Sequence, residues 1–218
     1  MENILVLDSG IGGLYTAKIL KEKYPSFNYI YFKDTFNCPY GNKSKEELLK
    51  IAQNNINFVL KRYKIRAVVL ACNTLSTNCV KELKKAYNLP FFTVEPPINK
   101  ITKPCVVLCT QTCFLAIKNG LVGEQIEYKE LTTFNTNINS INLLFCAMHN
   151  LAHIIEKDMC TKEMMKIYLK NILKPVKTEN YNQLLIGCTH YNFVVNQLQT
   201  LFNGYEILEG SEFVSLNN

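Results

Sequence analysis

Two cysteines of this chain occupy matched positions that could give their thiols a chemical role. Cys72 follows the apolar run 68–71 and Cys188 follows the apolar run 184–187, and each cysteine is followed by two polar residues. Both runs are typical of buried strands. In open α/β sheets the carboxyl ends of the strands form the ligand crevice. We therefore expect both thiols to point at a binding site.

The chemistry suggested by these thiols is proton transfer. A thiol just before a helix is stabilised as thiolate by the positive helix N-terminus, which pulls its pKa below the roughly 8.5 of free cysteine. A single free cysteine is often only a small core residue, so the interpretation depends on the pair. One thiolate and one thiol on opposite faces of a substrate carbon could remove a proton from one side and deliver one to the other. Ordered donors must then stabilise the negative charge on the substrate.

The glycine-rich loop at residues 8–13 is the next candidate. Its sequence, Asp8-Ser9-Gly10-Ile11-Gly12-Gly13, is close to a dinucleotide-binding fingerprint, but Tyr15 stands where the third glycine belongs. We interpret the loop as a helix N-terminus that presents N–H groups, with Asp8 at the mouth of the site. A capping role for Asp8 or Ser9 is the alternative.

A turn-rich loop at residues 34–42 also follows an expected strand. Tyr40 and the backbone of Gly41 and Asn42 could hold a carboxylate, although turn chemistry alone also accounts for this composition. Three further residues, Cys146, His149 and His153, fall at helical spacing, but no fourth metal ligand is evident and we expect them to be structural.

The elements that must position these residues alternate along the chain. Apolar runs predict strands at 4–7, 29–32, 67–70, 105–108 and 184–186. Helical patterns predict helices at 14–23, 45–63, 77–87, 141–156, 162–173 and from Phe193 onward, with a polar stretch at 132–140. This alternation is typical of right-handed βαβ units in an α/β fold with mostly parallel sheets. We expect an N-terminal lobe of residues 1–94 plus 203–218 and a second lobe of residues 95–202.

Composition limits the function classes. The chain has 218 residues, 48% hydrophobic and 19% charged, with a formal net charge of +6. Its lysines are spread along the chain, so we expect no nucleic-acid partner, although a positive potential would attract a dicarboxylate. There is no basic segment before the short apolar run at 4–7 and no run of membrane-spanning length. We expect a cytoplasmic protein with free thiols and no membrane partner.

With these motifs in view, the chain resembles glutamate racemases of the aspartate/glutamate racemase superfamily. The resemblance rests on the glycine loop with Leu14, Asp34-Thr35, Pro39 to Ser44, Ala71 to Thr74, Glu95-Pro96 and Gly187 to Tyr191. It implies two pseudosymmetric α/β lobes, each a mostly parallel sheet flanked by helices, with the active site between them. It implies Cys72 and Cys188 as bases assisted by Asp8 and His190. The implied substrate-binding residues are Asp8, Ser9, Pro39, Tyr40, Gly41, Asn73, Thr74, Thr110, Thr112, Thr189 and His190.

The resemblance also implies a small-molecule amino-acid substrate, production of D-glutamate for cell walls, and no pyridoxal phosphate, metal or other cofactor. It leaves a homodimer open. The second lobe departs from the family pattern, because Cys113 stands where a second threonine is usual. A family stretch ending in glutamate is replaced by residues 131–143, so we expect no acidic residue near the second thiol. These departures leave open a racemase for aspartate or another amino acid, or a homologue that binds ligand without turnover.

Overall fold

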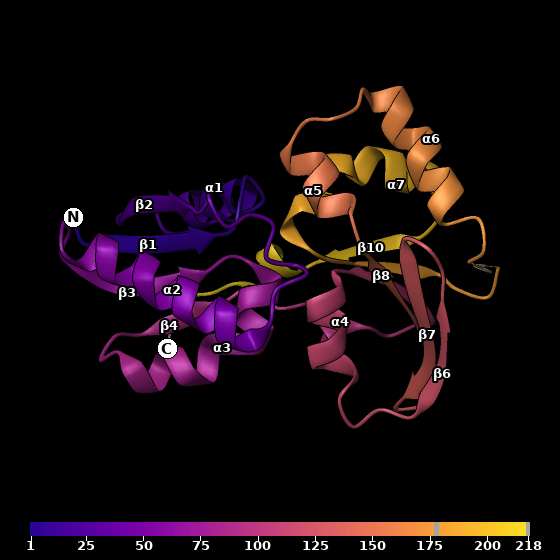
Figure 1. The fold of residues 1–218 in the computed structure, drawn as a ribbon, viewed down its shortest axis with the longest axis horizontal. Coiled ribbons are helices and arrows are strands. Elements are labelled where there is room, and N and C mark those ends of the chain that lie inside the picture. Colours follow the sequence, from indigo (N-terminus) through magenta and orange to yellow (C-terminus); the bar gives the residue numbers. More distant parts are fainter. Residues whose placement is uncertain (177–178, 217–218) are drawn as a thin grey trace.

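The computed structural model describes residues 1–176 and 179–216, and these form two lobes, each built on its own sheet (Figure 1). The first sheet has the strand order β2-β1-β3-β4 and is parallel throughout. Its strands are β1 (Asn3–Asp8), β2 (Asn28–Lys33), β3 (Ile65–Leu70) and β4 (Phe91–Thr93). The second sheet has the order β10-β9-β5-β8-β7-β6. Its strands are β5 (Cys105–Cys109), β6 (Gly123–Glu127), β7 (Leu131–Ile138), β8 (Ile141–Met148), β9 (Gln183–Gly187) and β10 (Glu206–Glu209).

Helices cover both faces of the first sheet. Leu5 and Leu7 of β1 pack in one cluster with apolar residues of α2 (Lys45–Leu60) and α3 (Asn73–Ala86). Ile4 and Val6, which alternate with them, pack on the opposite face with Leu20 of α1 (Gly13–Lys23). Successive side chains of a strand point to opposite faces, so a strand that is buried on both sides must be apolar at every position. This explains the unbroken apolar runs of β1 and β3.

The second sheet is also covered on both faces. One face packs against α5 (Leu151–Glu156), α6 (Lys162–Ile172) and α7 (Val195–Leu201), which Figure 1 shows together on one side of the sheet. The opposite face holds Phe114 of α4 (Gln111–Lys118) together with Phe134 and Phe145. Strands β10, β9, β5 and β8 are parallel, whereas β7 and β6 add antiparallel pairs at one edge. Short 3₁₀ helices lie at Ile98–Lys100, Thr189–Val194 (η2) and Gly210–Phe213 (η3).

The predicted helix at 141–156 is wrong for its first half. Residues 141–148 form β8, which is followed by the short helix α5, and the polar stretch at 132–140 forms most of β7. Asn139 and Ser140, both at positive φ, close the β7–β8 hairpin, as residues of a tight hairpin turn must. A short apolar run does not distinguish a buried strand from a buried helix by its periodicity. Cys146, His149 and His153 therefore do not lie on one face of a helix, because Cys146 lies in β8 and His149 precedes α5.

The chain returns to the first lobe later than expected. Strand β10 pairs with β9 in the second sheet, so residues 206–209 belong with the second lobe. Only after β10 does Ser211 contact Thr16 of α1, at 2.7 Å between hydroxyl oxygens, and Val214 pack beside Leu20. The pattern missed β10 because its sequence, Glu206-Ile207-Leu208-Glu209, is short and charged at both ends.

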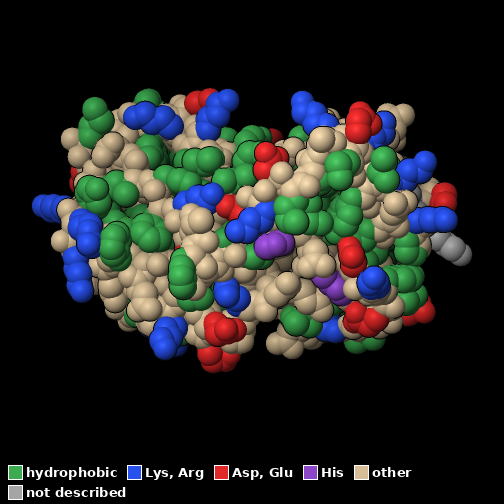
Figure 2. All heavy atoms as spheres, turned by 45° about the horizontal axis from the view of Figure 1, so that its top comes forward, with side chains coloured by type: hydrophobic (Ala, Val, Ile, Leu, Met, Phe, Trp, Pro, Cys, Tyr) green, Lys and Arg blue, Asp and Glu red, His purple; other side chains and the backbone are tan. Residues whose placement is uncertain are grey.

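The surface carries no concentration of one charge on the face shown in Figure 2, where lysine and arginine side chains are scattered among acidic and apolar ones. Histidine side chains are visible near the boundary between the lobes. Among the described residues, none of the helices is long and apolar enough to cross a bilayer.

Candidate active site

The loop after β1 brings a buried carboxylate to the boundary between the lobes. Asp8 ends β1 and is fully buried. Its Oδ1 accepts from the Gly10 N–H at 2.8 Å, and its Oδ2 accepts from the Thr189 hydroxyl of the other lobe at 3.2 Å. Burial raises the pKa of Asp8, against the lowering effect of His190 and these donors. Gly12 is needed here, because a Cβ at this position would lie 2.5 Å from the Thr189 hydroxyl oxygen.

Cys72 stands at the carboxyl end of β3, where it is the N-cap residue of α3. Its side chain is 5% exposed, and its Sγ lies 3.8 Å from the Ser9 hydroxyl. Burial, together with the nearby charge of Asp8, raises the pKa of the Cys72 thiol, although the Leu75 N–H at the helix N-terminus lowers it. The expectation that the helix N-terminus lowers the pKa of this thiol below its usual value is therefore wrong for Cys72, because burial outweighs the helix N-terminus.

Cys188 occupies the matching position in the second lobe, at the end of β9 and the N-cap of η2. It is 6% exposed, and its Sγ lies 4.0 Å from Nδ1 of His190. Burial lowers the pKa of His190, but contacts with Cys188, Cys38 and Glu156 outweigh this effect and raise the pKa well above its usual value. His190 is thus held as a cation beside the Cys188 thiol.

The two thiols share one site. Negative charge on Cys188 contributes to raising the pKa of Cys72, so the two sulfurs are close enough to interact across the boundary between the lobes. The strand ends that carry them belong to different sheets, β3 and β9. The structure thus brings one thiol from each lobe near the other.

Polar residues at the start of α3 face the same boundary. The hydroxyls of Thr74 and Thr110 lie 2.9 Å apart and link the lobes. Asn73 is 3% exposed, and its Nδ2 has no hydrogen-bond partner within residues 1–176 and 179–216. A buried amide donor without a protein partner is unfavourable unless a ligand or an ordered water satisfies it. Asn73 therefore has the chemistry expected of a substrate donor.

The loop at 38–43 reaches the second lobe through its backbone. The Thr112 N–H donates to Gly41 O at 2.9 Å, and the Thr112 hydroxyl donates to Lys43 O at 3.1 Å. Thr112 thus joins the lobes, with its hydroxyl already occupied. Gly41 packs against Thr110, where a Cβ would lie 2.9 Å from the threonine Cβ. Pro39 follows Cys38 through a cis peptide bond.

Tyr40 has a different environment from the one expected. It is buried, and its hydroxyl donates to Asp34 Oδ2 at 2.7 Å. Asn55 donates to the same oxygen at 2.8 Å, and Asn37 donates to both carboxylate oxygens. Burial raises the pKa of Asp34, but hydrogen bonds from Asn55, Tyr40 and Asn37 outweigh it and hold the pKa below its usual value. The Tyr40 hydroxyl therefore anchors the loop through Asp34.

Asp34→Asn should destabilise the protein by about 1–2 kcal/mol at pH 7, because an amide NH₂ would face donors that now find a carboxylate oxygen. The folded-state pKa of Asp34 is depressed, so its contribution is present above the unfolded-state pKa of about 3.9 and is lost as the pH falls below it. Urea unfolding should show the difference from wild type shrinking below about pH 4. The exposed Asp158→Asn is the control, and an equal effect of both substitutions at pH 7 would contradict the network.

Comparison with known proteins places this geometry in a family. No protein-family model matches the chain. The glutamate racemase of Clostridium acetobutylicum is 31% identical over 208 residues, covering 95% of this chain and 78% of the relative. The glutamate racemase of Buchnera aphidicola is 33% identical over 207 residues, covering 92% of this chain and 77% of the relative. The chain belongs to the glutamate racemase family.

Solved structures of glutamate racemases have the same fold. A crystal structure of a Bacillus anthracis glutamate racemase isoform matches with a TM-score of 0.78 at 24% identity, covering 97% of this chain and 77% of that chain. The Escherichia coli glutamate racemase, in complex with L-glutamate and the activator UDP-MurNAc-ala, matches with a TM-score of 0.77 at 22% identity, covering 97% and 79%. The expected two-lobed α/β architecture is confirmed.

An acidic residue, Glu156, lies near the second thiol. The expectation that no acidic residue lies near the second thiol was wrong, because Glu156, the last residue of α5, lies beside His190 with Oε2 at 2.9 Å from Nε2. The same oxygen accepts from the Ile11 N–H at 2.8 Å, and Oε1 lies 2.7 Å from Nζ of Lys33. Burial raises the pKa of Glu156, but donors from His190, Lys33 and Ile11 outweigh it and lower the pKa to about 2. Nothing in the sequence around Glu156 or Lys33 distinguishes them from ordinary surface charges.

Proposed function

We propose that the chain racemises glutamate, with Cys72 and Cys188 as the two acid/base groups, and that it supplies D-glutamate for cell-wall peptidoglycan. The observation that supports it most is the pair of buried thiols at equivalent strand ends of the two lobes, which interact electrostatically across the boundary between the lobes. Relatives named glutamate racemases over most of the chain support glutamate as the substrate.

The two thiols have unequal surroundings, which suggests how the first proton moves. Cys72 is held protonated by burial and Asp8, whereas Cys188 faces the His190 cation. In one direction a Cys188 thiolate removes the α-proton while the Cys72 thiol donates a proton to the opposite face. The roles exchange in the other direction, as a two-base mechanism requires. Donors such as Asn73 Nδ2 stabilise the charge that develops on the substrate carboxylate.

Substrate entry requires the lobes to separate, because both thiols are almost sealed from solvent. The contacts that must open are those between Thr74 and Thr110, Asp8 and Thr189, and Ile11 and Glu156. Each joins a residue of the first lobe to one of the second. Closure around the substrate then excludes water from the α-carbon.

Incubation with L-glutamate in heavy water tests the proposal. We expect loss of the α-proton signal in nuclear magnetic resonance spectra and formation of α-deuterated D-glutamate on chiral chromatography. L-Aspartate and a panel of other amino acids run in parallel test the alternative substrates. No exchange with any of them, in protein that binds glutamate by calorimetry, would indicate a homologue that binds without turnover.

Asn73→Ala should separate substrate binding from stability. The Asn73 amide donor has no partner among the described residues, so removing it should change the free energy of unfolding by less than about 1 kcal/mol. The KM for glutamate should rise about tenfold or more, since hydrogen bonds to a charged group are worth about 1.5–3 kcal/mol. An unchanged KM would exclude Asn73 from the substrate site. Asn78→Ala, which removes a donor to Thr74 O on the same helix, is the control.

A further inference from the structure

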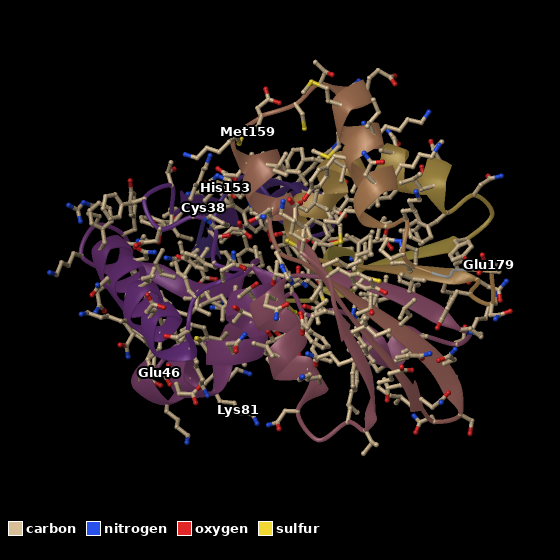
Figure 3. All side chains as sticks on the ribbon, turned by 45° about the vertical axis from the view of Figure 1, so that its right-hand side comes forward. Cys38, Glu46, Lys81, His153, Met159 and Glu179 are labelled. Carbon is tan, nitrogen blue, oxygen red and sulfur yellow. The ribbon has the colours of Figure 1, made fainter. Side chains whose placement is uncertain are left out.

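Three side chains of metal-ligating types meet at the boundary between the lobes. The Cys38 Sγ, a carboxylate oxygen of Glu156 and a ring nitrogen of His190 all lie within 4.8 Å of one another. They come from the loop after β2, the end of α5 and the start of η2, so two of the three belong to the second lobe and one to the first. Figure 3 shows Cys38 at the boundary between the lobes, on the side where α5 lies.

This set of donors matches the preferences of zinc. Zn²⁺ binds thiolate, imidazole and carboxylate ligands at about 2.0–2.3 Å in tetrahedral geometry, which places neighbouring ligand atoms about 3.3–3.7 Å apart. His190 Nε2 and Glu156 Oε2 are 2.9 Å apart, and the widest separation in the set is below 4.8 Å. Small side-chain rotations would bring all three atoms to bonding distance of one ion.

The surroundings favour a cation and hold one ligand in place. The Glu156 carboxylate supplies a negative charge, and the Lys33 ammonium contacts it through Oε1 and leaves Oε2 toward His190. The Ile11 N–H orients Oε2 from the other side. Hydrogen bonds of this kind, made by a ligand's other atoms, fix the orientation of the ligand in metal sites. An ion bound to His190 Nε2 and Cys38 Sγ would displace their protons to solvent and leave Nδ1 of His190 facing Cys188.

A route from solvent also exists. Of the nine cysteines, seven are buried and only Cys38 and Cys160 are partly exposed. Cys38 therefore offers a sulfur ligand that an ion can reach from solution, with the more deeply buried His190 close to it. The buried cysteines lack this access.

We propose that Cys38, Glu156 and His190 bind a thiophilic divalent cation of the zinc type, with water as fourth ligand, and that the bound ion inhibits the enzyme. The ion would join the Cys38 loop of the first lobe to α5 and η2 of the second. Because the thiols become accessible only when the lobes separate, an ion that ties the lobes together blocks substrate entry. The inhibitory part of this inference rests on the proposed racemase function, whereas the binding part does not.

Zinc titration of the metal-free full-length protein tests the binding. Isothermal calorimetry should show one tight site in wild type, at least about 100-fold weaker binding in Cys38→Val, and wild-type binding in Cys160→Ser, which removes the other partly exposed thiol. Zinc should raise the thermal unfolding temperature of wild type and Cys160→Ser but not of Cys38→Val. Cobalt should produce a thiolate-to-metal charge-transfer absorption that Cys38→Val lacks. Equal zinc affinity in wild type and Cys38→Val would overturn the site.

Racemisation assays test the inhibition. Zinc should inhibit glutamate exchange by wild type and Cys160→Ser, and chelator should restore it. The rate of Cys38→Val should stay at that variant's own zinc-free value at the same zinc concentration. If zinc binds tightly at Cys38 but does not inhibit the enzyme, the claim that the ion holds the lobes together and blocks substrate entry is wrong. If the wild-type protein does not racemise glutamate even without zinc, the proposed function is wrong. The calorimetric and cobalt results still decide whether the metal site exists.

Discussion

Replacing either thiol by a hydroxyl is expected to lower the rate of glutamate racemisation by about 10²–10⁴-fold. Serine keeps the size and position of Cys72 or Cys188 but is a much weaker acid, so it cannot form the required base near neutral pH. Each variant loses one side of the proton exchange, and inversion needs both sides. Circular dichroism of the glutamate solution measures the rate directly.

Glutamate binding and a control variant show whether the loss of activity comes from the missing thiol alone. Cys72→Ser and Cys188→Ser should still bind glutamate in calorimetry, because the donors of the site remain. Cys160→Ser, at a partly exposed thiol outside the site, should retain wild-type racemisation. A Cys188→Ser protein with wild-type activity would contradict the two-thiol mechanism.

Glu156→Gln is expected to reduce both activity and stability. The carboxylate accepts from Ile11 and contacts Lys33 and His190, with its side chain only 6% exposed. An amide in its place puts an NH₂ group against donors, which should cost about 2–3 kcal/mol of unfolding free energy. Loss of the negative charge also removes the support that keeps His190 protonated beside Cys188. We expect kcat to fall about 10²-fold.

The two effects can be separated by measuring kcat at a temperature where circular dichroism shows the variant fully folded. Glu179→Gln, at an exposed position of the same lobe, is the control and should change neither quantity. If kcat of the folded Glu156→Gln protein equals that of wild type, Glu156 only holds the lobes together and does not act through His190.

Local sequence patterns predicted the positions of the two thiols because those positions follow from short-range rules. A short apolar run that alternates with helical segments favours a buried parallel strand, and parallel strands bring their carboxyl ends to one edge. Cys72 and Cys188 lie at such ends in the structure, each as an N-cap residue. The same rules failed for β8, where a short apolar run is compatible with either a strand or a helix and only its neighbours in the sheet decide.

The sequence by itself therefore determined the parallel strands β1, β2, β3, β5 and β9 and the pair of cysteines that follow two of them, all of which depend on residues close together in the chain. The tertiary structure decided which side chains meet between the lobes. Ile11 and Glu156 are 145 residues apart in the chain, and Glu156 and His190 are 34 apart, yet each pair is joined at hydrogen-bond distance. No local pattern encodes such pairs, because their contact depends on how the packed sheets orient α5 and η2 toward the first lobe.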